Sequence, residues 1–166
     1  MDYYNKIAPS YNELHGEEQL EKMRLALLNL PSLGDSSKTI IDVGCGTGLA
    51  AKVFRAKITG VEPATELAKQ ASFRVYNAKA ESLPFPDKKF DIAVCFTAIH
   101  NFKSPAKAIK EMKRVSREFV VISILKKSRS YDSIKRLILQ EFKNVKEIKS
   151  SLDDIFICSV RFNSKA

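Results

Sequence analysis

The feature that most constrains this chain is a short apolar segment that runs directly into a cluster of glycines. Residues 39–51 read TIIDVGCGTGLAA, with glycines at Gly44, Gly46 and Gly48. The β-branched residues before Asp42 favour a buried strand, and glycines allow the backbone to turn sharply and approach a ligand closely. A helix is predicted to follow and to point its free amide groups at the loop. The pattern is typical of a nucleotide-cofactor loop and indicates an enzyme more than a scaffold.

A second strand is predicted over residues 57–62, KITGVE, and it ends in an acidic residue. Glu62 follows Asp42 by about 20 positions, where a Rossmann-type fold places the carboxylate that binds ribose hydroxyls. A glycine-rich turn alone does not separate NAD, FAD and S-adenosylmethionine (SAM) sites, since all three use it. The neighbouring segments must therefore decide between these cofactors.

The deciding segment is residues 80–91, which read AESLPFPDKKFD. With DVGCGTG at residues 42–48 and the glutamate that ends the second strand, in this order, the chain resembles the class I SAM-dependent methyltransferases. Within them it is similar to the small single-domain, methyltransferase type 11-like group. The resemblance extends from about Tyr3 to Val160 and implies SAM as the cofactor. A nicotinamide-dependent oxidoreductase stays as a minor alternative.

The rest of the chain predicts one alternation of strands and helices, without a linker, low-complexity tract or internal repeat. The resemblance implies a Rossmann-like, doubly wound α/β fold with a seven-stranded sheet in the order 3-2-1-4-5-7-6, strand 7 being antiparallel. The last stretch reads as two strands joined by a polar turn at 150–154, which fits such a terminal hairpin. The other strands are predicted near residues 39–43, 57–62, 73–76, 90–96 and 118–124, and the helices near 16–30, 48–55, 64–71, 105–117 and 131–142.

Length and composition are those expected of a single domain. The 166 residues can bury a substantial core, with residues 1–30 as an N-terminal cap segment and helix and residues 38–160 as the Rossmann-like core. No apolar stretch approaches the roughly 20 residues needed to cross a bilayer, and the first residues lack the layout of a signal peptide. We therefore expect a cytoplasmic protein without a membrane partner. Cys45, Cys95 and Cys158 lack metal-ligand spacing, so no metal site is expected.

The resemblance assigns roles to the residues around the glycine loop. Asp42 is expected to hold the methionine amino group of SAM, directly or through water. Glu62 is expected to accept hydrogen bonds from both ribose hydroxyls, because a carboxylate offers two acceptor oxygens to two adjacent donors. The other residues expected to line the cofactor are Gly44, Cys45, Gly46, Gly48, Pro63, Ala80, Glu81, Phe96, Thr97 and Tyr11.

One position departs from the family pattern. Relatives often carry an aspartate that accepts a hydrogen bond from the exocyclic amine of adenine, and this chain has Lys79 at that place. Lysine has only donors. Adenine recognition must then rely on backbone groups near Ala80 and Glu81, on Glu81 itself, or on packing by apolar residues such as Pro63.

His100 follows the segment FDIAVCFTA, where the family places its substrate-facing loop. Histidine exchanges protons near neutral pH, so His100 could be the catalytic base for a hydroxyl or ring-nitrogen acceptor. The favoured interpretation is that His100 and Asn101 cap the helix beginning near Ser104, since one residue cannot reveal catalytic use. The chain lacks the Asn/Asp-Pro-Pro-Tyr/Phe tetrad at this place, which argues against methylation of an amino nitrogen of adenine or glutamine.

The N-terminal segment is the candidate cover of the site. It carries Tyr3, Tyr4, Tyr11 and His15, and in relatives a similar stretch folds over the cofactor. Ordinary amphipathic packing of these rings is the equally weighted alternative.

The net charge of +9 raises the question of an RNA acceptor. The basic stripe Lys103, Lys107, Lys110, Arg114 and Arg117 is expected to be a solvated helix face opposite Ala108, Met112 and Val115. More informative are Lys126, Lys127 and Arg129, which follow the fifth strand at the edge where open α/β sheets bind ligands. Basic groups there would suit a phosphate backbone.

We therefore expect a SAM-dependent methyltransferase of unidentified acceptor, with RNA or protein slightly favoured over a small metabolite. The alternative is a catalytically silent or partner-dependent methyltransferase-like binding subunit, which the short length and Lys79 suggest. An activating protein partner is a further expectation from the resemblance.

Overall fold

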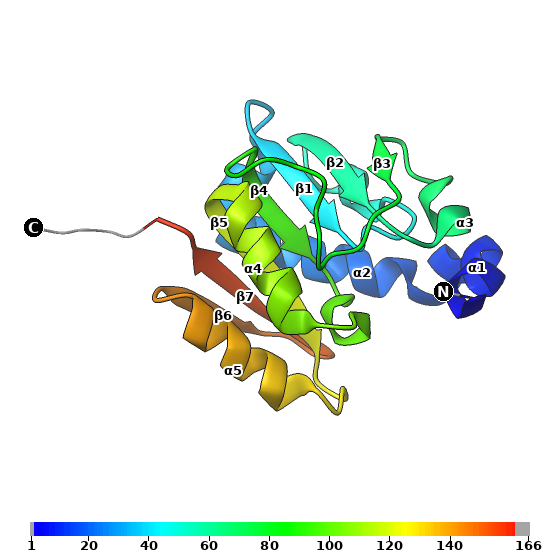
Figure 1. Ribbon diagram of the computed structural model, residues 1–166. Coiled ribbons are helices and arrows are strands. Elements are labelled where there is room, and N and C mark those ends of the chain that lie inside the picture. Colours follow the sequence, from blue (N-terminus) through cyan, green and yellow to red (C-terminus); the bar gives the residue numbers. More distant parts are fainter. Residues whose placement is uncertain (1, 162–166) are drawn as a thin grey trace, which may run out of the picture.

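The computed structural model describes residues 2–161, and a seven-stranded mixed sheet runs through their centre (Figure 1). The strand order is β3-β2-β1-β4-β5-β7-β6, and β7 is antiparallel to both of its neighbours. The predicted order and the antiparallel strand are thus confirmed. The strands are β1 (Thr39–Val43), β2 (Lys57–Val61), β3 (Val75–Tyr76), β4 (Phe90–Cys95), β5 (Ser116–Leu125), β6 (Val145–Lys149) and β7 (Asp153–Ser159).

The helices predicted over 16–30, 64–71, 105–117 and 131–142 are present with different lengths, and the short helix α1 was not predicted. α2 begins at Tyr11, before its predicted start at Gly16, and α3 is a single turn where a helix over 64–71 was predicted. The α-helices are α1 (Asp2–Ile7), α2 (Tyr11–Asn29), α3 (Thr65–Ala68), α4 (Pro105–Val115) and α5 (Tyr131–Glu141), and the 3₁₀ turns are η1 (Ala8–Ser10), η2 (Pro31–Gly34), η3 (Leu49–Lys52) and η4 (Ile99–Asn101).

The helix predicted over residues 48–55 is wrong, because this segment forms only the 3₁₀ turn η3. Gly48 has a φ of 80°, so the chain leaves the glycine loop in a left-handed conformation and cannot begin a regular helix there. Phe54 then turns into the core, where it is 3% exposed, just before β2. The free amide groups expected at a helix N-terminus are therefore not supplied by an α-helix.

Helices cover both faces of the sheet, with α4 and α5 on one face and α2 on the other (Figure 1). In β1, Ile40 and Ile41 are both fully buried because neighbouring residues of a strand point to opposite faces. Ile41 belongs to the core that contains Met112 of α4 and Ile138 of α5. Ile40 belongs to the core that contains Met23 of α2. The central strands are therefore apolar on both sides, as parallel strands between helices must be.

The N-terminal helix α1 packs beside α3, at the ends of β1 and β2 (Figure 1). A small apolar cluster of Ala8, Ala64 and Leu67 joins these segments, and Tyr4 and Tyr11 pack against it. The N-terminal residues thereby reach the carboxyl edge of the sheet. Among residues 2–161, no helix is both long and apolar enough to cross a membrane.

The left-handed conformation of Gly48 predicts a specific sensitivity of the fold. A Cβ at this position would lie 2.7 Å from the Cβ of Ala71, in addition to the strain of a positive φ. We expect Gly48→Ala to lower the free energy of unfolding by about 2 kcal/mol or more. The matched control is Gly16→Ala in α2, where the new Cβ would have an ordinary contact of 3.7 Å with Asn12. It should stabilise the protein by roughly 0.5–1 kcal/mol. Urea unfolding of both variants checks the opposite signs, and equal effects would contradict the strained turn.

Candidate functional site

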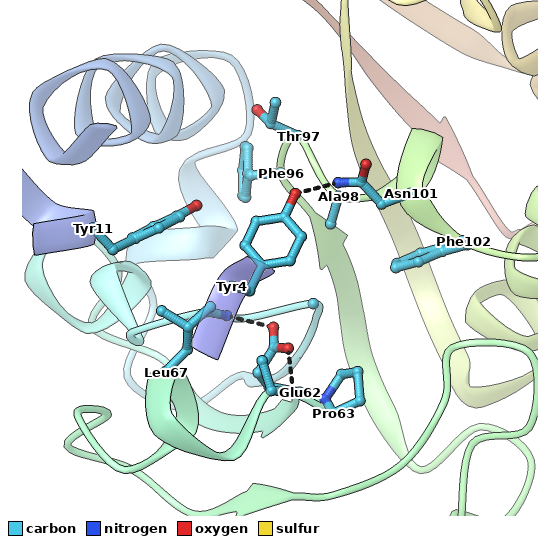
Figure 2. A pocket seen from close by; sticks show the side chains of 13 residues that line it. Tyr4, Tyr11, Glu62, Pro63, Leu67, Phe96, Thr97, Ala98, Asn101 and Phe102 are labelled. Atoms are coloured by element: carbon cyan, nitrogen blue, oxygen red, sulfur yellow. Dashed lines mark hydrogen bonds between the residues drawn. The ribbon is translucent and has the colours of Figure 1, made fainter. Parts of the chain in front are cut away.

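Two adjoining cavities open at the carboxyl edge of β1, β2 and β4. The inner cavity, of about 160 Å³, is bounded by residues of the glycine loop, the end of β4 and the N-terminal segment (Figure 2). The outer cavity, of about 480 Å³, shares Gly44, Pro63, Asn101 and Phe102 with it. The inner cavity is lined by Tyr4, Tyr11, Gly44, Gly46, Glu62, Pro63, Ala64, Leu67, Phe96, Thr97, Ala98, Asn101 and Phe102. We call the two together the cleft.

Most of the residues predicted to line a cofactor meet in this cleft. Ala80 and Glu81 line the outer cavity together with Lys79. Asp42 and Cys45 lie beside a small cavity of about 20 Å³, which shares Tyr11, Gly44, Gly46 and Phe96 with the inner one. Gly48 lines none of these cavities. Tyr4 and Asn101 also line the cleft. The sequence gives only a weak signal for them, which is the presence of tyrosines in the N-terminal segment.

The glycine loop is held against β2 by its own amide groups. Gly44 N and Cys45 N both donate to the carbonyl oxygen of Val61, at 2.8 and 3.2 Å. Gly44 and Gly46 have φ values of 75° and 54°. A Cβ at Gly44 would lie 2.7 Å from the Cβ of Ala98, across the cleft wall. The loop therefore offers a close backbone surface to a ligand, while these amide groups are used within the protein.

Glu62 connects the glycine loop to the segment that leads into α3. Its carboxylate accepts hydrogen bonds from Gly46 N at 3.0 Å and from Ala64 N at 2.8 Å, which fix both oxygens at the cavity wall (Figure 2). Burial raises the pKa of Glu62, and these two hydrogen bonds partly offset the rise. A carboxylate oxygen can accept more than one hydrogen bond, so Glu62 retains capacity for a ligand.

Asp42 presents an unsatisfied carboxylate at the end of β1. It is 1% exposed, and its Oδ2 atom forms no hydrogen bond within residues 2–161. Burial, and to a lesser extent the charge of Glu62, raise the pKa of Asp42 to about 7. A buried carboxylate without a partner is costly. The arrangement suits a cationic ligand group that would pair with Asp42.

The N-terminal segment forms a roof over the inner cavity. The hydroxyl of Tyr4 accepts a hydrogen bond of 2.7 Å from Nδ2 of Asn101, so α1 and η4 meet above the cavity (Figure 2). Burial, followed by the charges of Tyr4 and Glu62, raises the pKa of Tyr11 to about 12. Tyr3 is 62% exposed and lines no cavity of the cleft. Of the three tyrosines predicted as a cover, Tyr4 and Tyr11 line the inner cavity.

His100 lies close to the cleft but lines neither cavity. Its Nδ1 atom is buried without a hydrogen-bond partner among residues 2–161, and burial lowers its pKa. The capping interpretation is wrong, because the Ser104 hydroxyl caps α4 by accepting from Lys107 N at 3.4 Å. Asn101 instead binds Tyr4. The structure therefore does not bring the imidazole into contact with the cavity space.

A buried ion pair supports the wall of the cleft, and no pattern in the sequence indicates it. Lys22 of α2 lies 3.0 Å from Oδ1 of Asp153, the first residue of β7, and the two side chains are 3% and 0% exposed. Thr97 joins them, donating to Asp153 at 2.7 Å and accepting from Lys22 at 2.5 Å. Thr97 itself has a φ of 52°. The pair thus holds a strained residue of the cavity wall in place.

The basic residues divide into paired and unpaired ones. Lys126 is bound to the β6–β7 turn, where it donates to the Ser150 carbonyl and lies 3.4 Å from Asp154. Lys127 and Arg129 are exposed and form no side-chain hydrogen bond or ion pair with residues 2–161. Arg114 and Arg117 of the predicted basic stripe pair with acidic residues, whereas Lys103 and Lys107 line the outer cavity. Unpaired positive charge therefore flanks the cleft.

The three cysteines are free and buried. Burial raises the pKa of the Cys45 thiol, which fits a small buried side chain in a crowded turn and opposes a reactive thiolate. Within residues 2–161 no group of histidine, cysteine, aspartate and glutamate could hold a metal ion.

The buried pair predicts a large stability effect. Lys22→Met would leave the carboxylate of Asp153 buried without its cation, so we expect the free energy of unfolding to fall by about 3–5 kcal/mol. The matched control is Arg24→Met in the same helix, because the Arg24–Glu17 pair is 56% and 81% exposed. That change should stay within about 0.5 kcal/mol. Denaturant unfolding compares the two, and a loss of similar size in both variants would contradict the importance of the buried pair.

Comparison with known proteins gives one family and one fold. Residues 41–122 match a family model described as a methyltransferase domain. An uncharacterized protein of Methanocaldococcus jannaschii is 30% identical over 152 residues, which are 87% of this chain and 59% of that protein. The chain spans about three fifths of the length of the first curated relatives it matches.

Solved structures with the same fold include two that cover nearly the whole of this chain. A protein of Methanococcus maripaludis, described as an S-adenosyl-L-methionine-dependent methyltransferase, aligns with a TM-score of 0.77 and 14% identity, covering 98% of this chain and 95% of that chain. A Haloferax volcanii chain from a complex with the Trm112 methyltransferase activator aligns with a TM-score of 0.75 and 11% identity, covering 96% and 98%.

The matched segment begins in β1 and ends in β5, so it contains the glycine loop, Glu62 and the edge of β4. These are the parts that build the cleft. Solved structures with this fold are described as SAM-dependent methyltransferases, which indicates SAM as the cofactor. Because the family match and the cleft coincide, we conclude that this chain belongs to the class I SAM-dependent methyltransferases.

Proposed function

We propose that the protein binds SAM in the cleft and transfers its methyl group to an acceptor. The observation that carries this proposal is the buried Oδ2 atom of Asp42, which has no hydrogen-bond partner within residues 2–161. It lies beside the small cavity that adjoins the cleft, and the cleft holds a second carboxylate, Glu62, and Gly44, which has no room for a side chain. SAM carries one ammonium group and two ribose hydroxyls, which complement these two carboxylates.

The residues of the cleft fit this cofactor in a defined order. Asp42 would hold the ammonium group, Glu62 the ribose hydroxyls, and the apolar residues Pro63 and Ala80 would pack against the base. SAM, when bound, supplies a methyl group that its sulfonium already activates. Tyr4 and Tyr11 would exclude water from above, and the wall held by Thr97 would fix the alignment on which the rate of transfer depends.

We propose RNA as the first candidate acceptor, protein as the second and a small metabolite as the third. Lys103 and Lys107 at the outer cavity, and Lys127 and Arg129 after β5, have no side-chain partner within residues 2–161. The net charge is +9. Such free cations suit a polyanionic acceptor. His100 receives no catalytic role in this proposal, because it does not line the cleft.

A partner-dependent or silent methyltransferase-like subunit is the second candidate. It is supported by the likeness of this chain to the Haloferax volcanii chain that was solved with the Trm112 methyltransferase activator. Binding of SAM without turnover on any RNA or protein acceptor by the isolated chain would favour it. Turnover by the isolated chain would favour the first proposal.

Glu62→Ala provides the direct test of the cofactor site. Loss of a carboxylate that accepts from the ribose should weaken SAM binding by at least about tenfold, or about 1.4 kcal/mol, in isothermal titration. The matched control is Glu66→Ala in α3, whose side chain is exposed and pairs with Lys69 at 2.6 Å. NAD should not bind either protein. Unchanged SAM affinity in Glu62→Ala would exclude Glu62 as a residue that binds SAM.

The pKa of Asp42 predicts how binding responds to pH. In the free protein this pKa is raised to about 7, so much of Asp42 is protonated at pH 6. The SAM ammonium favours the ionised carboxylate, and the dissociation constant should therefore fall between pH 6 and 7.5, with release of a proton. Above this range the ligand's own amino group, with a pKa near 8, begins to lose its charge.

Asp42→Asn is the control for this pH dependence. It should bind SAM more weakly and show a flat profile, measured by titration in two buffers of different ionisation enthalpy. A wild-type profile that is equally flat, without proton release, would contradict the ammonium contact.

A further inference from the structure

Gln19 of α2 is a buried polar side chain without a hydrogen-bond partner. The residue is 7% exposed, and its amide forms no hydrogen bond within residues 2–161. It lines the small cavity of about 20 Å³ that adjoins the cleft, together with Asp42 and Tyr11. Burying an amide without a partner costs free energy, and such a group in a folded protein calls for an explanation. A ligand group that enters this cavity would supply the missing partner.

Two other side chains at the small cavity have free hydrogen-bonding groups. The Oδ2 atom of Asp42 has no partner, and the hydroxyl of Tyr11 forms no hydrogen bond within residues 2–161. Thr47, by contrast, donates its hydroxyl hydrogen to Asn12 at 2.6 Å. No lysine, arginine or histidine is among the described residues that line this cavity. The free side-chain groups are therefore one carboxylate, which accepts, and two neutral groups that can donate.

These free groups match the two charged groups of an α-amino acid. The ammonium group pairs with Asp42 in the proposed function, and the carboxylate is bonded to the same carbon atom as the ammonium, so it must lie in adjoining space. A carboxylate only accepts hydrogen bonds, whereas a glutamine amide offers two N–H donors. Burial raises the pKa of Tyr11 to about 12, so its hydroxyl stays protonated at neutral pH and can donate.

We propose that Gln19 donates a hydrogen bond to the α-carboxylate of SAM and, with Asp42, recognises the amino-acid end of the cofactor. This inference rests on the proposed binding of SAM and concerns only its carboxylate. Tyr11 supplies a second donor. A cation in the place of Gln19 would pair with Asp42 and compete with the ammonium group of the ligand. A neutral donor holds the carboxylate and leaves Asp42 to the ammonium.

The test compares two ligands that differ only in this carboxylate, S-adenosyl-L-homocysteine and its decarboxylated form S-adenosyl-3-thiopropylamine, by isothermal titration. Gln19→Met removes the amide and nearly keeps the size of the side chain. It should weaken binding of S-adenosyl-L-homocysteine by at least about tenfold and change binding of the decarboxylated ligand by less than about threefold. A packing defect would weaken both ligands alike. Because an unpaired buried amide is removed, the unfolding midpoint should equal or exceed that of the wild-type protein.

The matched control is Met23→Leu, because Met23 lies one turn further along α2, lines the same small cavity and is 5% exposed. This change exchanges two apolar side chains of similar size and should leave both affinities unchanged. An equal loss for both ligands in Gln19→Met, or no loss for S-adenosyl-L-homocysteine, would overturn the role of Gln19 while SAM binding stands. Binding of neither ligand to the wild-type protein would overturn the proposed function as well.

Discussion

The cleft depends on the two hydrogen bonds that the carboxylate of Glu62 accepts. One comes from Gly46 in the loop after β1, and the other from Ala64 in the segment before α3. Without this carboxylate, two loops that follow neighbouring strands would have unpaired amide groups facing each other. The side chain that we propose to bind the ribose thus also organises the wall in which the ribose would lie. The proposed ligand contact and the loop geometry therefore depend on one residue.

The second constraint is the buried pair of Lys22 and Asp153. A buried ion pair often adds little net stability, because both charges lose their hydration. Here the pair joins three elements that are distant in sequence: α2, the end of β4 through Thr97, and β7. The pair instead positions the cavity wall, because it fixes Thr97, a residue with positive φ, at the edge of the cavity. The C-terminal hairpin thereby contributes to the cleft without lining it.

The strand order was predictable from the family resemblance, and the core strands were predictable from local patterns in the sequence. β1 and β4 are mainly apolar segments, each with one aspartate, and the terminal hairpin shows its turn at Ser150. The buried pair was not predictable, since Lys22 lies in a helix rich in charged residues and its partner is far along the chain. The turn η3 was missed because the left-handed conformation of Gly48 and the burial of Phe54 override the helix propensity of LAAK. For His100, helix-capping logic could not show that Ser104 performs that role.

The roof of the cleft is attached far more lightly than the sheet is packed. α1 is held by the small cluster around Ala8 and Leu67 and by the hydrogen bond between Tyr4 and Asn101, whereas the two faces of the sheet bury extensive apolar cores. Segments with few buried contacts open at a much lower free energy than the global unfolding transition. Local release of α1 would therefore open the inner cavity without unfolding of the sheet. The free energy needed to open the cleft is in this way separate from the free energy of unfolding of the whole domain.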